Sequence, residues 1–239
     1  MHKILIIIPT YNEIENIASI INAVLEISSQ YHILIVDDNS PDGTAAVVKA
    51  IKGVYGSRLD IIEREGKLGL GTAYIRGFQY ALEQDYEFIM EMDADFSHNP
   101  KSIDAIYKAC QGDGVGMAVG SRYVKGGGFV NWSKYRLFLS YGASIYTRLI
   151  TGMTVKDATA GFVMYKREAL QKMDLSKIEF IGYAFQIEMK YYVHSLGYKI
   201  AEVPITFVDR ELGTSKMDSS IIKEAVLGVI KMRFRNYSS

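Results

Sequence analysis

Two aspartates separated by one residue, Asp93 and Asp95, follow a short apolar run at residues 88–92. Carboxylates this close repel one another unless a cation lies between them. Oxygen ligands select a hard ion such as Mg²⁺ or Mn²⁺, which often completes its coordination with substrate phosphates and water. For an isolated Asp-x-Asp the alternative is that Asp95 only caps the next segment. Together with a second acidic cluster, the pair favours a metal site for a nucleotide diphosphate.

The second acidic cluster, Asp37 and Asp38, ends another apolar run at residues 33–36. In donor-binding folds built from alternating strands and helices, one such acid holds the ribose or base of the nucleotide. A solvated turn is an equally good interpretation, because turn-forming residues follow directly: Ser40-Pro41-Asp42-Gly43. Glu13 lies shortly after the first apolar run. The alternative to a binding role for Glu13 is that its charge stabilises the N-terminus of the next helix.

The elements that must position these acids alternate between strand and helix. Mostly apolar runs at residues 3–8, 33–36, 59–62 and 88–92 are typical of strands, and the first is β-branched, as in a strand buried on both faces. Residues 14–25, 44–51 and 69–82 carry apolar side chains at helical spacing. This βαβαβαβ order predicts an α/β fold with a mainly parallel central sheet and a ligand site beyond the carboxyl ends of its strands.

The second half of the chain has a looser pattern. We expect a short helix ending near Cys110, a strand through Val119 and a flexible glycine loop at residues 126–128 that could act as a lid. Amphipathic stretches at residues 134–150 and 219–234 carry apolar stripes with basic residues near them. The 239 residues are expected to form one domain, in which residues 1–100 bind the nucleotide sugar and residues 101–239 bind the acceptor.

Composition excludes several classes of protein. Lys plus Arg and Asp plus Glu are equal at 27 each, so the global basic field that binds nucleic acid is absent. The single cysteine, Cys110, rules out an internal disulfide and favours the cytoplasm. The apolar start at residues 4–8 is too short for a signal peptide, and charged residues interrupt every stretch long enough to cross a membrane.

Several motifs occur in order along nearly the whole chain, and together they are highly specific. They are Pro9-Thr10-Tyr11-Asn12-Glu13, Asp37-Asp38-Asn39-Ser40-Pro41-Asp42-Gly43-Thr44, Leu68-Gly69-Leu70-Gly71-Thr72-Ala73-Tyr74, Asp93-Ala94-Asp95-Phe96-Ser97-His98, Gly120-Ser121-Arg122-Tyr123, Phe185-Gln186-Ile187-Glu188-Met189, Val203-Pro204-Ile205, Phe207-Val208-Asp209-Arg210 and Ser215-Lys216. With these motifs the sequence resembles the dolichol- and polyprenol-phosphate mannose synthases, inverting glycosyltransferases of family 2. The resemblance implies a GT-A fold, which is a Rossmann-like nucleotide-diphospho-sugar transferase fold.

The resemblance also implies roles for individual residues. The nucleoside of a GDP-sugar would be contacted by Pro9, Tyr11, Glu13, Val36 and Asp38. The diphosphate and its Mg²⁺ or Mn²⁺ would lie at Asp93, Ala94 and Asp95, with Ser97 as a further metal ligand. Phosphate groups would be met by Arg122, Arg210 and Lys216, and the acceptor phosphate by Arg136 and Ser140, which are spaced i, i+4. We expect Asp95, Arg122 and Arg210 to be catalytic.

The sequence departs from the family pattern at three positions. Asn39 stands where glycine is usual, a mild change because asparagine tolerates left-handed backbone geometry. Ala160 replaces a serine, and Val163 replaces a basic residue two positions after Gly161. Compared with longer members, the chain also lacks C-terminal membrane spans. The changes at Ala160 and Val163 leave acceptor detail and sugar identity open.

The implied acceptor is a polyprenyl phosphate, whose insoluble tail requires the enzyme to reach a membrane surface. We therefore expect peripheral association with the cytoplasmic face of a membrane, and residues 219–234 are a candidate docking helix. The alternative to membrane docking is that this helix packs against the sheet. For Arg136, the alternative to binding the acceptor phosphate is that it is an ordinary surface charge. The sequence leaves open whether a small membrane-anchoring subunit takes part.

Other functions fit the sequence less well. A dinucleotide-dependent oxidoreductase needs Gly-x-Gly-x-x-Gly after the first strand, where Pro9-Thr10-Tyr11 stands. A phosphatase with an aspartate nucleophile accounts for Asp-x-Asp but not for the second acidic cluster, and a sugar-nucleotide sensor has no need of a metal pair. Within the same fold, a transferase that uses a UDP-sugar and acts on undecaprenyl phosphate or a saccharide remains open.

Overall fold

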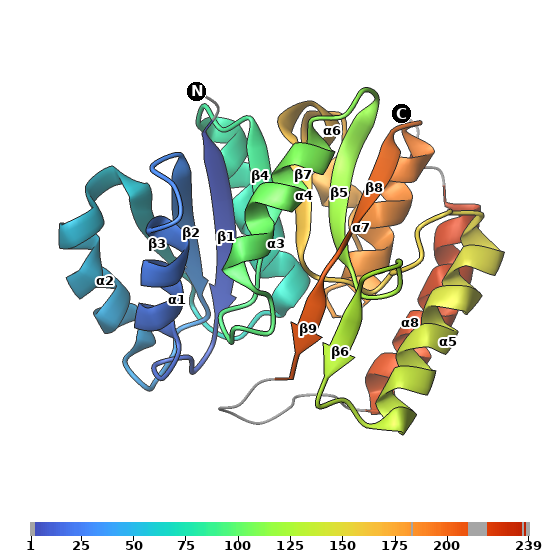
Figure 1. The fold of residues 1–239 in the computed structure, drawn as a ribbon, viewed down its shortest axis with the longest axis horizontal. Coiled ribbons are helices and arrows are strands. Elements are labelled where there is room, and N and C mark those ends of the chain that lie inside the picture. The colour runs from blue at the N-terminus through green and yellow to red at the C-terminus, as the bar shows by residue number, and fades with distance from the viewer. Residues whose placement is uncertain (1–2, 183, 210–218, 236, 238–239) are drawn as a thin grey trace.

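The computed structural model describes residues 3–182, 184–209, 219–235 and 237, which form a central sheet between two helical layers (Figure 1). Seven strands lie in the order β3-β2-β1-β4-β7-β5-β8. Their bounds are β1 (Ile4–Thr10), β2 (Tyr31–Asp37), β3 (Leu59–Glu63), β4 (Phe88–Glu91), β5 (Val115–Ser121), β7 (Val163–Lys166) and β8 (Lys199–Pro204).

The N-terminal half of the sheet has the predicted parallel arrangement. β1 pairs in parallel with both β2 and β4, and β2 pairs in parallel with β3. The isoleucine-rich run of β1 is at most 1% exposed from Ile4 to Ile8, as expected for a strand covered on both faces. The carboxyl ends of these strands consequently meet at one edge, where the acidic clusters lie.

Strand β7 was not anticipated from the sequence. It lies between β4 and β5 and runs antiparallel to both, with Glu91 of β4 opposite Val163 of β7. Only four residues long, it is too short for its pattern to indicate a strand. Because it starts at the edge where β4 ends, the loop before it lies next to the acidic pair.

Helices cover both faces of the sheet. On one face α1 (Ile17–Leu25), α2 (Thr44–Tyr55) and α4 (Ile103–Cys110) contribute to one apolar cluster with the strands. On the other face a second cluster contains residues of α3 (Leu70–Glu83), α6 (Arg167–Gln171) and α7 (Ala184–Ser195). The first helix begins at Ile17 rather than Ile14, and the N–H of Ile14 donates instead to Asp42, in the turn before α2.

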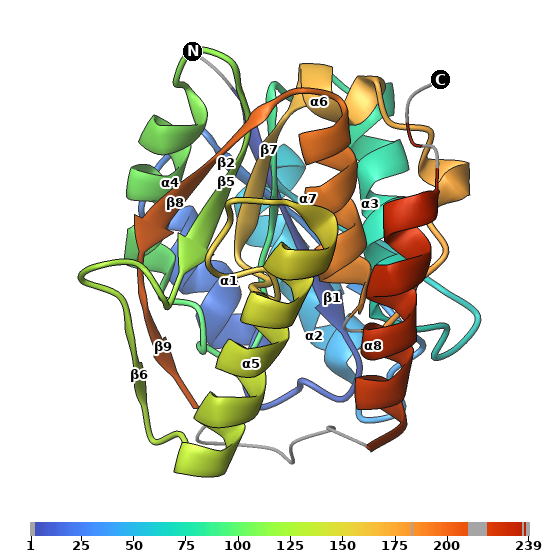
Figure 2. The same cartoon turned by 90° about the vertical axis from the view of Figure 1, so that its right-hand side faces the viewer.

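Helices α5 (Lys134–Thr151) and α8 (Ser219–Phe234) lie side by side at one end of the molecule, as Figures 1 and 2 show. The Tyr146 hydroxyl of α5 donates to the Val226 carbonyl of α8 at 2.9 Å. Val229 and Met232 of α8 are buried in the core. Part of this helix therefore packs inside the protein, which was the predicted alternative to membrane docking. Within the described residues, no helix has both the length and the apolar character needed to span a membrane.

A second, two-stranded sheet joins β6 (Gly128–Val130) in parallel to β9 (Thr206–Val208). Gly128, expected in a flexible loop, instead begins β6 and donates its N–H to the Ile205 carbonyl at 3.0 Å. A side chain at Gly127 would place its Cβ 2.6 Å from the Ser121 carbonyl oxygen. Gly127 therefore permits close backbone packing, and the prediction of a loop is wrong for Gly128, which lies in β6.

Candidate active site

The two aspartates that follow β4 line a pocket of about 420 Å³ at the carboxyl edge of the sheet. Asp95 is 9% exposed, and the side chain of Asp93 is 39% exposed. The Oδ1 atom of Asp95 accepts the Ser97 N–H at 3.0 Å. Asp95 therefore caps the next turn, as the alternative interpretation predicted, and also faces the pocket.

Ser97 supplies a third oxygen beside the acidic pair. Its side chain is buried and lines the same pocket, and its hydroxyl has no hydrogen-bond partner among the described residues. Two carboxylates and an unsatisfied hydroxyl suit a hard cation that takes its remaining ligands from phosphate and water. The described part of the chain contains no group of three His, Cys, Asp or Glu side chains that could hold a metal alone.

His98 orders the segment that carries these oxygens. Its Nδ1 accepts the Asp93 N–H at 3.2 Å, and its ring stacks on Phe162 with centroids 4.7 Å apart. Burial lowers the pKa of His98 to about 4, so the imidazole is neutral near pH 7. A neutral ring that accepts at Nδ1 fixes the backbone of the acidic pair without adding charge to it.

The predicted nucleoside-binding residues lie along the same edge of the sheet. Pro9 and Val36 are direct partners in the β1–β2 register. Val36 is fully buried, and Ala94 is nearly so at 4% exposure. The Tyr11 ring is half-buried, with the Lys67 ammonium 4.9 Å from its centroid.

The neighbouring carboxylates of Asp37 and Asp38 have different surroundings. Asp37 is fully buried and accepts hydrogen bonds from the Thr10 hydroxyl at 2.7 Å and the Ser40 N–H at 2.8 Å. Asp38 instead forms an ion pair with Arg64, whose Nε donates to its Oδ1 at 2.6 Å. Asp37 thus holds the turn, as the turn interpretation predicted, whereas Asp38 carries a charged partner that the sequence did not indicate.

Two further predictions concern the turns beside these acids. Asn39 has a φ of 57°, the left-handed geometry that explains why glycine is usual there. Glu13 lies in the turn before α1, where its Oε2 accepts from the Asn16 amide at 3.1 Å and its N–H donates to the Thr44 hydroxyl at 3.0 Å. It therefore lies outside the first helical turn, which contains no acidic residue.

Arg122 is held in the pocket wall by a buried carboxylate. Its Nε and Nη2 donate to the two oxygens of Asp157 at 2.7 and 2.6 Å, and Nη2 also donates to the Thr159 hydroxyl at 2.9 Å. Burial lowers the pKa of Arg122, but its hydrogen bonds to Asp157 outweigh this and raise it. Four aromatic rings lie within 5.3–5.7 Å of its guanidinium carbon: Tyr123, Phe129, Trp132 and Phe207.

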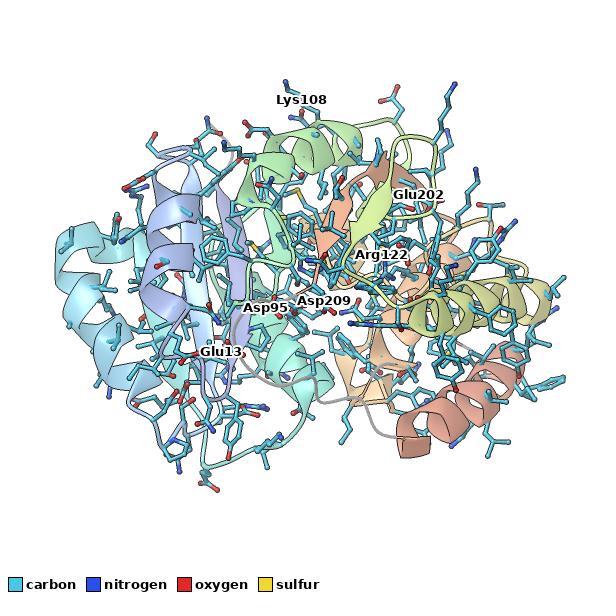
Figure 3. All side chains as sticks on the ribbon, turned by 60° about the horizontal axis from the view of Figure 1, so that its bottom comes forward. Glu13, Asp95, Lys108, Arg122, Glu202 and Asp209 are labelled. Carbon is cyan, nitrogen blue, oxygen red and sulfur yellow. The ribbon has the colours of Figure 1, made fainter. Side chains whose placement is uncertain are left out.

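Arg136 and Ser140, spaced one turn apart on α5, both line the pocket, as the i, i+4 spacing predicted. Arg136 is therefore not an ordinary surface charge. Its Nη1 donates to both oxygens of Asp209 at 2.9 Å, and its guanidinium lies 4.2 Å from the Trp132 ring centroid. Asp95, Arg122 and Asp209 gather near the middle of the molecule in Figure 3. Arg210 and Lys216 lie outside the described residues.

A buried polar cluster under the pocket was missed by the sequence analysis. Gln186 of α7 lines the pocket, and Glu91 and Lys190 lie behind it with 0% exposure. Val163 is opposite Glu91 in the sheet, at the position where the resembled family has a basic residue. Lys190 supplies a cation from α7 instead. The only signal in the sequence was the motif Phe185-Gln186-Ile187-Glu188-Met189, which is part of the resemblance but gave Gln186 no role.

Comparison with protein families gives one match that spans most of the chain. The model described as glycosyl transferase family 2 matches residues 5–174. A polyprenol monophosphomannose synthase from Mycolicibacterium smegmatis is 44% identical over 98% of this chain and 88% of its own length. An undecaprenyl-phosphate mannosyltransferase from Micrococcus luteus is 41% identical over 96% of this chain and 93% of its own.

Solved structures with low sequence identity share the fold. Glucosyl-3-phosphoglycerate synthase from Mycobacterium tuberculosis, in complex with Mn²⁺, UDP-glucose and glycerol 3-phosphate, has a TM-score of 0.70 at 17% identity, covering 97% of this chain and 80% of that one. A mannosyltransferase from Pyrobaculum calidifontis, in complex with GDP-mannose and Mn²⁺, has a TM-score of 0.62 at 17% identity, covering 89% and 58%. The fold is therefore that of the GT-A enzymes, as predicted.

Proposed function

The chain belongs to glycosyl transferase family 2 and is a polyprenyl-phosphate mannosyltransferase, and we propose that it takes mannose from GDP-mannose in a metal-dependent, inverting reaction. The observation that carries this proposal is a single pocket lined at once by Asp93 and Asp95 and by Arg136 and Ser140 of α5. Donor and acceptor phosphates can therefore meet in one site.

The donor is bound along the edge formed by β1, β2 and β4. The main chain at Pro9 and Val36, the Tyr11 ring and the carboxylates of Glu13 and Asp38 bind its nucleoside. Oxygens of Asp93, Asp95 and Ser97 would hold a Mg²⁺ or Mn²⁺ ion. When bound, this ion neutralises charge that develops on the departing nucleoside diphosphate.

The acceptor is a phosphate monoester, whose second pKa is about 6, so its oxygen is already anionic near neutral pH. The reaction accordingly needs no strong general base. Its main obstacle is repulsion between an anionic nucleophile and the donor diphosphate, which Arg122 and Arg136 reduce from the pocket wall, together with Arg210 and Lys216. The acceptor oxygen attacks the anomeric carbon opposite the leaving group, which inverts the configuration.

A transfer assay with labelled GDP-mannose, Mn²⁺ and undecaprenyl phosphate tests this proposal. We expect Asp95→Ala to lower the rate by at least about 10²–10³-fold, the usual effect of removing one group that stabilises a transition state. Asp85→Ala is the matched control, because Asp85 is an exposed aspartate in the turn before β4, at the opposite end of that strand. Near-normal turnover by Asp95→Ala, or a preference for UDP-glucose over GDP-mannose, would contradict the proposal.

We also propose that the paired helices α5 and α8 contact the membrane that holds the lipid acceptor. Their exposed apolar side chains include Tyr135 at 71%, Phe138 at 74%, Leu149 at 79%, Leu227 at 69% and Phe234 at 86%. The pocket lining continues onto these helices through apolar residues: Phe138, Leu139, Ala143, Val226 and Val229. Basic residues in the last turn of α8, Lys231 and Arg233, favour an anionic lipid surface.

Sedimentation with phosphatidylglycerol vesicles tests this contact. Removing α8 would also remove the buried Val229 and Met232, so substitutions are more informative than a truncation. We expect the double variant Phe138→Ser, Phe234→Ser to lose most of its vesicle binding. Val54→Ser is the control, since Val54 is 80% exposed but lies on α2 at the far end of the molecule (Figure 1). Equal binding by both proteins would exclude the docking role of this surface.

A further inference from the structure

The side-chain amide of Gln186 lies between two oppositely charged groups. Its Nε2 donates to Glu91 Oε2, and its Oε1 lies 3.4 Å from the Lys190 Nζ. A carboxylate can only accept hydrogen bonds when ionised, and an ammonium can only donate. The two charges therefore determine which way the amide points, so its nitrogen faces Glu91 and its oxygen faces Lys190.

The charged groups are themselves held in place. Tyr165 donates its hydroxyl to Glu91 Oε1 at 2.7 Å, and Lys190 Nζ donates to the Ala160 carbonyl at 2.7 Å and the Gln186 carbonyl at 3.1 Å. Burial raises the pKa of Glu91 to about 7 and lowers that of Lys190 to about 8. Each group therefore depends on the other to remain charged in the core.

One hydrogen of the Gln186 amide has no acceptor among the described residues. Gln186 is only 3% exposed, yet it lines the pocket together with Gly161 and His98. A Cβ atom added to Gly161 would lie 3.7 Å from Gln186 Nε2 and 3.8 Å from His98 Cε1. The absence of a side chain at Gly161 thus leaves space directly in front of the amide nitrogen.

We propose that Gln186 donates a hydrogen bond to a hydroxyl of the transferred sugar, and that Glu91 and Lys190 are positioning residues that orient its amide. The inference rests on the proposed function, because it takes the donor diphosphate to lie at Asp93 and Asp95 in the same pocket. A hexose attached to that diphosphate offers hydroxyl oxygens as acceptors. The two buried charges set the amide orientation before the sugar arrives, so little conformational entropy is lost on binding.

Calorimetric titration with GDP and with GDP-mannose, each with Mn²⁺, tests the role of Gln186. Gln186→Met keeps the length of the side chain but removes its polar atoms. We expect its affinity for GDP-mannose to fall about tenfold, as one lost hydrogen bond to a ligand can produce, while its affinity for GDP stays unchanged. Gln171→Ala, an exposed position on α6, is expected to change neither affinity.

The possible outcomes separate the hypotheses. If Gln186→Met binds GDP-mannose as tightly as the unaltered protein, Gln186 does not contact the sugar. An equal loss of affinity for GDP and GDP-mannose would show a structural role and would also overturn the inference. If the unaltered protein binds GDP but gains nothing from the mannose, or prefers UDP-glucose, the proposed donor is wrong instead.

The orientation role of Lys190 has its own test. Lys190→Met removes the charge that faces the amide oxygen, and Lys190→Arg restores a cation. We expect Lys190→Met to raise the KM for GDP-mannose with a smaller change in kcat, and Lys190→Arg to recover part of the loss. Circular dichroism confirms that each variant is folded before the kinetics are compared. Equal effects of the two substitutions would contradict an orienting charge.

Discussion

Replacing Asp157 by asparagine should destabilise the protein more than any change at a surface ion pair. Asp157 is fully buried and accepts three hydrogen bonds from Arg122, from its N–H, Nε and Nη2 at 2.9, 2.7 and 2.6 Å. The guanidinium is itself only 8% exposed. Asp157→Asn leaves that buried cation without a counter-charge, a change that typically costs about 3–5 kcal/mol.

This loss is large relative to the stability of a folded domain, which is roughly 5–15 kcal/mol. For a chain of this length, about 2–4 °C of melting temperature is lost per kcal/mol, so the midpoint should fall by roughly 6–20 °C. Urea titration gives the free energy directly. The single tryptophan, Trp132, lies 5.3 Å from the Arg122 guanidinium and reports on this region by fluorescence.

An exposed ion pair provides the matched control. Lys49 and Glu63 form a salt bridge of 2.6 Å, but their side chains are 54% and 47% exposed. Glu63→Gln should therefore cost about 0–1 kcal/mol. If Asp157→Asn proves no more destabilising than Glu63→Gln, Arg122 does not depend on Asp157 for its burial, and Asp157 does not hold Arg122 in the pocket wall.

Two further outcomes are expected from close packing. Gly77→Ala should destabilise the protein by about 1–3 kcal/mol in urea titration, because the new Cβ would lie 2.7 Å from a side-chain carbon of the buried Ile7. Gly53→Ala is the control and should not destabilise the protein, because its Cβ would have no atom within 4 Å. Cys110 should react slowly with a thiol-specific disulfide reagent at pH 8 until urea unfolds the chain, because its side chain is fully buried. Burial also raises the pKa of its thiol to about 12, against about 8.5 for an exposed thiol. Rapid labelling of the native protein would show that α4 opens locally.

The sequence predicted the parallel half of the sheet because each strand there carries its own signal. The runs ending at Asp37 and before Asp93 are mostly apolar and closed by polar residues, so their order alone determines where the acids meet. The position of the acidic pair at the pocket, and the shared orientation of Arg136 and Ser140, followed from the same local reasoning. These features depend on residues close together in the chain.

The buried charges could not be predicted in the same way. Arg64, Asp157 and Lys190 resemble surface residues in the sequence, because their partners are far away along the chain. Arg64 lies 26 positions from Asp38, and Asp157 lies 35 positions from Arg122. Lys190 interacts with the charge of Glu91, which lies about 100 positions away on another element. Helix α7 is buried on all sides, including Gln186 and Lys190, so it lacks the apolar stripe that normally indicates which side faces the core. Only tertiary packing shows which charges are inside.

The pairing of α5 with α8 has a consequence for the growing chain. Val226 and Val229 of α8 complete a wall of the pocket, but they are synthesised after every strand of the sheet. Strands β1 to β4 are made before these residues, and they contribute to an apolar cluster that also contains residues of α1 and α2. During synthesis, therefore, the strands that carry the acidic clusters can assemble early, whereas the pocket wall formed with α5 is complete only after α8 has been made.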